Sequence, residues 1–122
     1  QWIRPVPFSI IRRVLYLPTR NKMIEIKKQK NKAVALDGEK EVGLCEYREE
    51  DGKWILYHTF VEKEYGGQGI ALTLLECLVE EARKEGKKII PQCSYVRHVF
   101  EKNKDKYIDI IAPLPSSFSS DQ

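Results

Sequence analysis

The residue types that could do chemistry gather in one short segment, YGGQGIA at residues 65–71. Three glycines in four residues permit a tight turn and leave the backbone amides uncovered. An amphipathic stretch follows, and the first turn of a helix offers unpaired N–H groups and the positive end of the helix dipole. The segment therefore predicts a phosphate or diphosphate site. Its spacing matches neither the P-loop nor the dinucleotide fingerprint, and the alternative is a glycine-rich helix entry that holds no ligand.

His58 is the best titratable candidate for a general base. An imidazole titrates near neutral pH, so it can accept a proton from a reacting group. Strand alternation predicts that His58 shares one face with Trp54, Leu56 and Phe60. The alternative is a hydrogen-bonded histidine of the core.

Cys93 lies between a predicted strand and a predicted helix, whose N-terminus would stabilise a thiolate. Its alternative is a buried cysteine that acts as a small apolar side chain. Nothing nearby would activate Cys45 or Cys77, so we expect both to be structural. Three cysteines without a C-x-x-C pair predict neither a disulfide framework nor a zinc site. They indicate a reducing, cytoplasmic compartment.

The elements that would position these residues follow from hydrophobic periodicity. Alternating and β-branched runs predict four antiparallel strands in a meander over residues 23–29, 33–36, 41–49 and 54–61, with Asp-Gly pairs in two turns. A helical period covers residues 68–85 and ends at Gly86. A short strand over residues 88–93 and a helix with Ser94 as its N-cap follow, to about residue 103. The order β-β-β-β-α-β-α predicts an α+β fold with one helical crossover.

A chain of 122 residues predicts a single domain. We expect a folded domain at 23–112, a disordered tail at 113–122, and an N-terminal extension or leader at 1–22. The only methionine is Met23, so translation could start there; the alternative is an arm that packs on the domain. No apolar run is long enough to predict a membrane span.

The net charge of +3 is unevenly distributed. Residues 1–22 hold five basic and no acidic side chains, whereas the rest of the chain holds 16 basic and 18 acidic ones. The basic 1–32 region could belong to a nucleic-acid-binding domain. We rank this function third and lowest, because the folded part lacks a basic stripe with interleaved aromatic residues.

Residues 60–71, FVEKEYGGQGIA, resemble the acetyl-CoA signature of the GNAT superfamily of N-acetyltransferases. The pair HT at 58–59 and the run PQCSYV at 91–96 resemble its minimal YjdJ-type branch. The resemblance covers residues 23–111 and implies a mixed sheet whose fourth and fifth strands part at one end. The pantetheine arm of acetyl-CoA would lie in that split and the diphosphate on the amides of residues 67–71. The implied cofactor-binding residues are Phe60, Val61, Gly66, Gly67, Gln68, Gly69, Ile70 and Ala71.

The resemblance implies an acetyl-CoA-dependent enzyme that passes the acetyl group directly from the thioester to an amine, without a metal. Such chemistry needs a base for the amine, a donor to the thioester carbonyl and an acid for the leaving thiolate. The candidate catalytic residues are His58, Cys93 and Tyr95. Cys93 would donate to the thioester or accept the acetyl group covalently. Tyr95 would replace the acid tyrosine of many superfamily members, whose place Phe100 fills.

The sequence does not identify the acceptor amine. Only residues 30–32 separate the first two predicted strands, so the usual acceptor-binding helices are missing. A shallow groove would suit a lysine or N-terminal amine of a protein or peptide, and a small polyamine is the alternative. Because the usual acid is absent, a CoA-binding module without catalysis is the second-ranked function.

Overall fold

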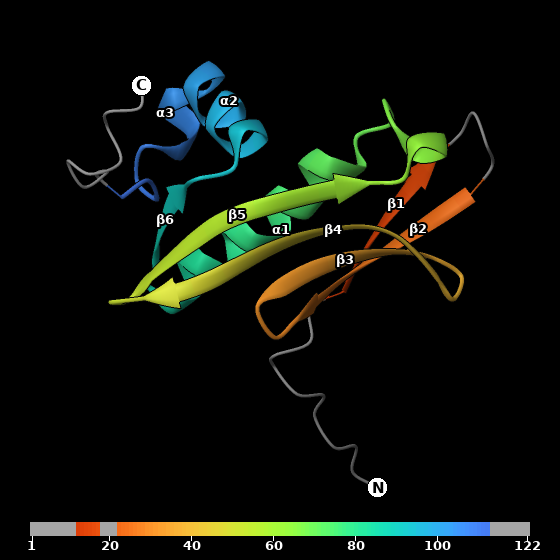
Figure 1. Cartoon of the computed structure of the whole chain (residues 1–122), viewed down its shortest axis with the longest axis horizontal. Helices are drawn as coiled ribbons and strands as arrows, with labels where there is room; N and C mark the ends of the chain where they lie inside the picture. Colours follow the sequence, from red (N-terminus) through yellow and green to blue (C-terminus); the bar gives the residue numbers. More distant parts are fainter. Residues whose placement is uncertain (1–11, 18–21, 113–122) are drawn as a thin grey trace, which may run out of the picture.

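The computed structural model describes residues 12–17 and 22–112. Within them, six strands form one sheet in sequence order (Figure 1). They are β1 (Arg12–Leu17), β2 (Lys22–Gln29), β3 (Lys32–Asp37), β4 (Lys40–Glu50), β5 (Lys53–Val61) and β6 (Lys88–Pro91). Strands β1 to β5 are antiparallel, and β6 pairs with β5 in parallel.

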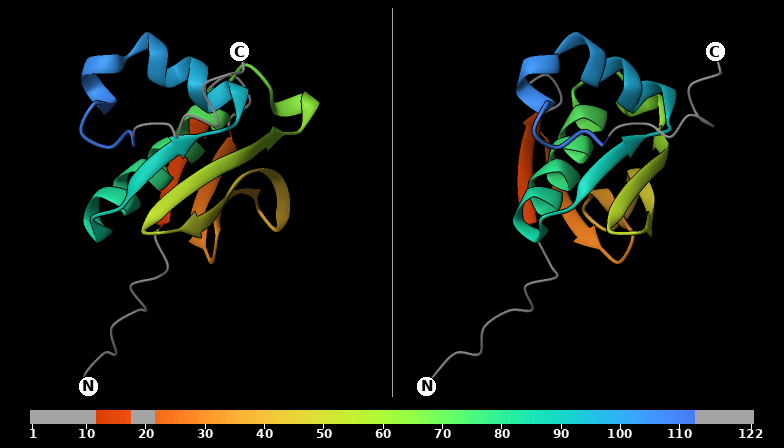
Figure 2. Two further views of the ribbon diagram at one scale, coloured as in Figure 1. Left: turned by 60° about the vertical axis from the view of Figure 1, so that its left-hand side comes forward. Right: turned by 90° about the vertical axis from the view of Figure 1, so that its left-hand side faces the viewer.

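The helices follow β5. A single 3-10 turn, η1 (Lys63–Tyr65), leads into α1 (Ile70–Glu85), and α2 (Ser94–Lys102) and α3 (Lys104–Tyr107) lie together beyond the end of β6 (Figure 2). Helix α1 packs across one face of the sheet and contacts all six strands, from β1 to β6. The predicted order is therefore confirmed, although Cys93, not Ser94, is the N-cap residue of α2. The predicted apolar face of α1 is buried in the core: Ile70, Leu74, Leu75, Leu78, Val79 and Ala82.

Strand β1 adds to the predicted meander. It pairs with β2 from Arg12↔Lys27 to Leu17↔Lys22, and Leu17 is buried in the core. The sequence had not indicated this strand, because its residues run apolar without alternation after two arginines. The rest of the predicted extension, residues 1–11 and 18–21, and the predicted disordered tail, residues 113–122, lie outside the described residues.

A β-bulge divides β5 into two halves. Tyr47 pairs with Leu56, but its neighbour Glu46 pairs with His58, so Tyr57 is an extra residue. Such an insertion exchanges the two faces of a strand. Trp54 and Leu56 point into the core beneath α1, and beyond the bulge Thr59, directly opposite the buried Cys45, takes over that face.

The predicted alternation of Trp54, Leu56, His58 and Phe60 on one face is therefore wrong. His58 is exposed, and Phe60 has 49% of its surface exposed. Both lie on the face of the sheet opposite α1, which also bears the exposed Tyr16 and Met23 of β1 and β2 and which we call the open face. The alternative of a core histidine is excluded as well.

Strands β5 and β6 separate after a short pairing. The pairs run only from Lys53↔Lys88 to Leu56↔Pro91. The N–H groups of Gln92 and Cys93 then both donate to the carbonyl oxygen of Leu56, at 3.1 and 2.8 Å, as the chain turns into α2. Residues 57–61 of β5 extend past this point, so the sheet opens between them and the start of α2.

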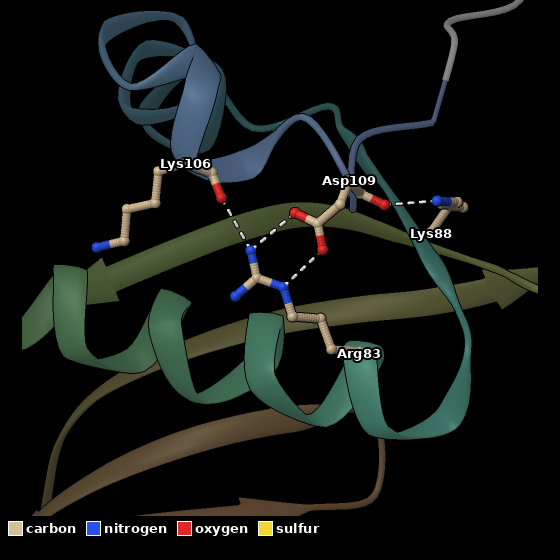
Figure 3. Close-up of polar contacts among 4 residues, drawn as sticks. All are labelled: Arg83, Lys88, Lys106 and Asp109. Carbon is tan, nitrogen blue, oxygen red and sulfur yellow. Dashed lines mark hydrogen bonds and ion pairs between the residues drawn. The ribbon is translucent and has the colours of Figure 1, made fainter.

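The segment after α3 is fastened to α1 and β6. Arg83 of α1 donates to both carboxylate oxygens of Asp109, at 3.0 and 2.9 Å, and to the carbonyl oxygen of Lys106 (Figure 3). Lys88 donates to the carbonyl oxygen of Asp109. Ile89 bonds with residues 110 and 112 through its backbone, which covers the outer edge of β6. These bonds hold the segment after α3, which follows α2 in the chain, against α1 and β6.

A polar contact fastens η1 to the sheet. The hydroxyl of the buried Tyr65 donates to the carboxylate of Asp37, at 2.5 Å, where β3 ends. Lys22, the first residue of β2, donates to the same oxygen at 2.8 Å. Bonds from Lys22 and then Tyr65 lower the pKa of Asp37, and the Asp37 contact raises the pKa of Tyr65. Tyr65 is the first residue of the glycine segment, so this contact sets where that segment starts.

We predict that Asp37→Asn lowers stability in a pH-dependent way. Because the pKa of Asp37 is lowered in the folded state, its contribution is present above the pKa of the unfolded chain and is lost as the pH falls through the folded value. The urea midpoint of the variant should lie below that of the wild type near pH 7, and the gap should close toward about pH 3. Asp51→Asn, in the exposed turn before β5, is the matched control. A gap that stays constant over this range would contradict the prediction.

Candidate functional site

A hollow of about 220 Å³ lies where the glycine segment, the end of β5 and the first turns of α1 and α2 meet. It contains seven of the eleven residues singled out from the sequence. Its lining is Val61, Tyr65, Gly66, Gly67, Gly69, Ile70, Ala71, Leu72 and Tyr95. Segments that are far apart in the chain therefore converge on the entry to α1.

The glycine segment has the backbone that the sequence predicts. Gly67 and Gly69 have φ angles of 73° and 87°, in the left-handed region that favours glycine. A Cβ atom at either position would meet no atom within 4 Å, so the space beside the loop is open. Gly69 is the N-cap of α1, and its carbonyl oxygen accepts bonds from the N–H and the hydroxyl of Thr73. The first N–H groups of α1 are left for another acceptor.

Two further observations bear on whether this loop fits a diphosphate. Gln68 does not line the hollow, but its Oε1 atom is buried without a hydrogen-bond partner among the described residues. Gly66 has an extended backbone, and a Cβ there would lie 3.4 Å from the carbonyl oxygen of Lys63. The position would accept a larger side chain, so Gly66 is not required by conformation. The open cradle fits an anionic ligand, whereas the unpaired Oε1 atom of Gln68 is an acceptor and needs a hydrogen-bond donor.

Three polar side chains meet at the opening between β5 and α2. The Oγ1 atom of Thr59 lies 3.4 Å from the Sγ of Cys45 and 3.6 Å from the Sγ of Cys93. Cys45 is fully buried, and burial raises its pKa to about 12, so it is inert. Cys93 is partly exposed at the N-cap of α2. All three cysteines are free thiols.

Tyr95 stands in the first turn of α2 and lines the hollow. Burial is the main cause that raises the pKa of Tyr95. Its hydroxyl is therefore protonated at neutral pH and can donate a proton. Phe100, which fills the place of the usual acid, is buried and stacks on Tyr107 with a ring separation of 4.7 Å. It belongs to the core and not to the site.

The structure does not bring all predicted residues to the hollow. His58 and Phe60 point to the open face, away from Thr59 and the α1 side of β5. Cys93 lies at the opening beside Thr59 but does not line the hollow. Two residues here, Thr59 and Tyr65, were not among those predicted from the sequence. Tyr65 stands in the glycine segment itself, but only the fold brings Asp37 to its hydroxyl.

Among residues 12–17 and 22–112, no group of three His, Cys, Asp or Glu side chains is arranged to hold a metal ion. In the same part of the chain, no helix has the length and hydrophobicity needed to cross a membrane.

Comparison with known proteins agrees with this geometry. The family model of the GCN5-related N-acetyltransferases matches residues 32–110. The NMR solution structure of a GCN5-like protein from Staphylococcus aureus, proposed to be an N-acetyltransferase, is similar at 35% sequence identity and a TM-score of 0.60. The similarity covers 78% of this chain and 94% of that protein. No curated protein matches the chain. The chain belongs to the GCN5-related N-acetyltransferase family and is an N-acetyltransferase enzyme.

Proposed function

We propose that this protein transfers the acetyl group of acetyl-CoA directly to an amine. The observation that carries the proposal is one hollow that joins an open glycine cradle, the unpaired end of β5 and the hydroxyl of Tyr95. The diphosphate, the thioester and the leaving group belong to one extended molecule, so they need one continuous site, and this hollow offers it. We also assign the chain to the YjdJ-type branch, on the run at residues 91–96 that forms the turn from β6 into α2.

The chain's own groups would hold the cosubstrate at two places. The N–H groups of residues 67–71 would bind the diphosphate, where the dipole of α1 adds to the attraction. The backbone of β5 near Phe60 and Val61 lies on the edge that β6 leaves unpaired, so its peptide groups can bond with the pantetheine amides.

The reacting groups would be divided between the two faces of β5. Tyr95 would protonate the leaving thiolate, since burial keeps its hydroxyl neutral. Cys93 would donate to the thioester or accept the acetyl group, from the opening beside Thr59. His58 would take the proton from an amine that approaches over the open face.

The acceptor would be an amine of a protein or peptide. Strands β2 and β3 are joined by a turn at residues 30–31, and no helix stands between them to wall off a small cavity. Exposed strand residues, among them Tyr57 and Phe60, offer a flat apolar surface instead. A small polyamine is the alternative acceptor. The three free cysteines suit a reducing compartment such as the cytoplasm.

A CoA-binding module without catalysis is the second candidate, because the place of the usual acid holds the buried Phe100. Both candidates bind CoA, so only turnover separates them. Release of free CoA from acetyl-CoA in the presence of lysine peptides and polyamines should exceed the uncatalysed rate if the protein is an enzyme.

We predict that Gly69→Asp abolishes CoA binding while the fold is kept. A Cβ at this position meets open space, so the cost is the strained φ of 87° and the new charge at the diphosphate position. Gly69→Asn is the matched control, because it has the same shape and tolerance of this φ without the charge. Calorimetry should give an affinity for CoA that is at least about tenfold weaker for Asp than for Asn. Equal affinities would refute the diphosphate assignment.

We predict that Cys93→Ala lowers kcat at least about tenfold and leaves the affinity for CoA within about twofold. The thiol lies at the opening, outside the glycine cradle, so its loss should affect the transfer and not the binding. Cys77→Ala, which removes a buried thiol in α1, controls for packing. Wild-type turnover by Cys93→Ala would remove this residue from the chemistry.

We predict that Tyr95→Phe lowers kcat about 100-fold with little change in the KM for acetyl-CoA, as expected for the loss of a general acid. Because the pKa of Tyr95 is raised, the wild-type activity should fall only above the usual range of a tyrosine. That alkaline limb should disappear from the pH profile of the variant. A profile that keeps the limb would assign the acid to another group.

A further inference from the structure

We propose that Thr59 is a positioning residue whose hydroxyl, backed by the buried thiol of Cys45, stabilises the thiolate form of Cys93. The use of that thiolate as the nucleophile that takes the acetyl group, while the C–S bond to CoA breaks and Tyr95 protonates the CoA thiolate, rests on the proposed function; the hydrogen-bond chain itself does not.

The three side chains come from β4, β5 and the N-terminal end of α2, and both thiols contact the hydroxyl of Thr59. Cys45 of β4 and Thr59 of β5 are direct partners in the sheet, with 3.4 Å between Sγ and Oγ1. Cys93 approaches from the N-cap of α2, with its Sγ at 3.6 Å from the same oxygen. Because of the bulge at Tyr57, Thr59 and not His58 occupies the core face here. The bulge therefore places a hydroxyl between two thiols.

The two thiols differ in burial, and this difference sets the direction of the hydrogen bonds that they form with Thr59. Burial raises the pKa of Cys45 to about 12, so Cys45 keeps its S–H and can donate it. Cys93 is partly exposed and caps a helix, which favours a negative charge on its sulfur. While Cys93 is protonated, its S–H donates to Thr59 Oγ1. When it ionises, the hydroxyl turns and donates to Cys93, and Cys45 donates to Thr59.

The titratable groups around these thiols do not replace that donor. Tyr95 of α2 acts on both thiols through charge, and Cys77 of α1 acts on Cys45 in the same way. Glu46 of β4 is acidic, and its charge opposes a thiolate. His58, the neighbour of Thr59 in β5, is exposed on the open face. The hydroxyl of Thr59 is thus the neutral donor within bonding distance of the Cys93 sulfur.

The experiment measures alkylation of Cys93 by iodoacetamide at about pH 7.5, with the site read by mass spectrometry and no acetyl-CoA present. Thr59→Val keeps the shape and removes the hydroxyl, whereas Thr59→Ser keeps the hydroxyl. Loss of one bond to a charged sulfur should lower the thiolate fraction about tenfold. The higher reactivity of a more basic thiolate offsets part of this, so the rate should fall about threefold. Thr59→Ser should stay within about 1.5-fold of the wild type.

Controls separate the hydrogen bond from packing. Cys45→Ala removes the backing donor and should slow alkylation by about twofold, whereas Cys77→Ala, an equally buried thiol, should not change it. If Thr59→Val does not fold, Thr59→Ala against Thr59→Ser carries the same comparison. Equal rates for Val and wild type, or a Ser variant as slow as Val, would overturn the inference. Neither result depends on acetyl-CoA, so a failure of the proposed function, seen as no CoA binding by the wild type, is a separate outcome.

Discussion

The extra residue at Tyr57 is the constraint on which the site depends. A strand that pairs without interruption would keep Trp54, Leu56 and His58 on one face, and an imidazole would be buried in the core. The bulge exchanges the faces at the point where β6 ends its pairing. One half of β5 thus packs in the core, and the other half gives Thr59 to the inner side and His58 to solvent. The same insertion increases the local twist, which suits a strand that must part from its neighbour.

The glycine segment depends on a second constraint, at its start. Left-handed φ angles at Gly67 and Gly69 determine the shape of the loop, but they do not determine where it stands. Tyr65 does, because its ring is buried and its hydroxyl is fixed to Asp37 and, through it, to Lys22. At its other end the loop is held by α1, whose apolar face is buried along its whole length. The glycine loop is therefore held at both ends, and its backbone amides stay uncovered in a fixed position.

The sequence predicted those features that depend on neighbours in the chain. Helix α1, the hairpin turns and the glycine cradle each follow from local periodicity or from a glycine at a required φ, and the structure confirms them. The features that failed depend on partners far away. The predicted face of His58 was wrong because a β-bulge has no sequence signal as clear as the Asp-Gly pair of a turn. Thr59 and Tyr65 were missed because Cys93 lies 34 residues from one and Asp37 lies 28 from the other. Strand β1 was missed because its core residue, Leu17, stands in a run without alternation.

The division of β5 also bears on how so small a domain can perform a transfer between two substrates. Because the hollow lies on the α1 side of β5 and His58 faces the other side, the proposed acetyl donor and amine would approach the strand from different directions. The hollow and Tyr95 belong to the α1 side, whereas His58 and Phe60 belong to the open face. The opening between β5 and α2, beside Thr59 and Cys93, is where the two sides meet. In the proposed reaction a cosubstrate held on the α1 side would present its thioester at this opening to an amine on the open face.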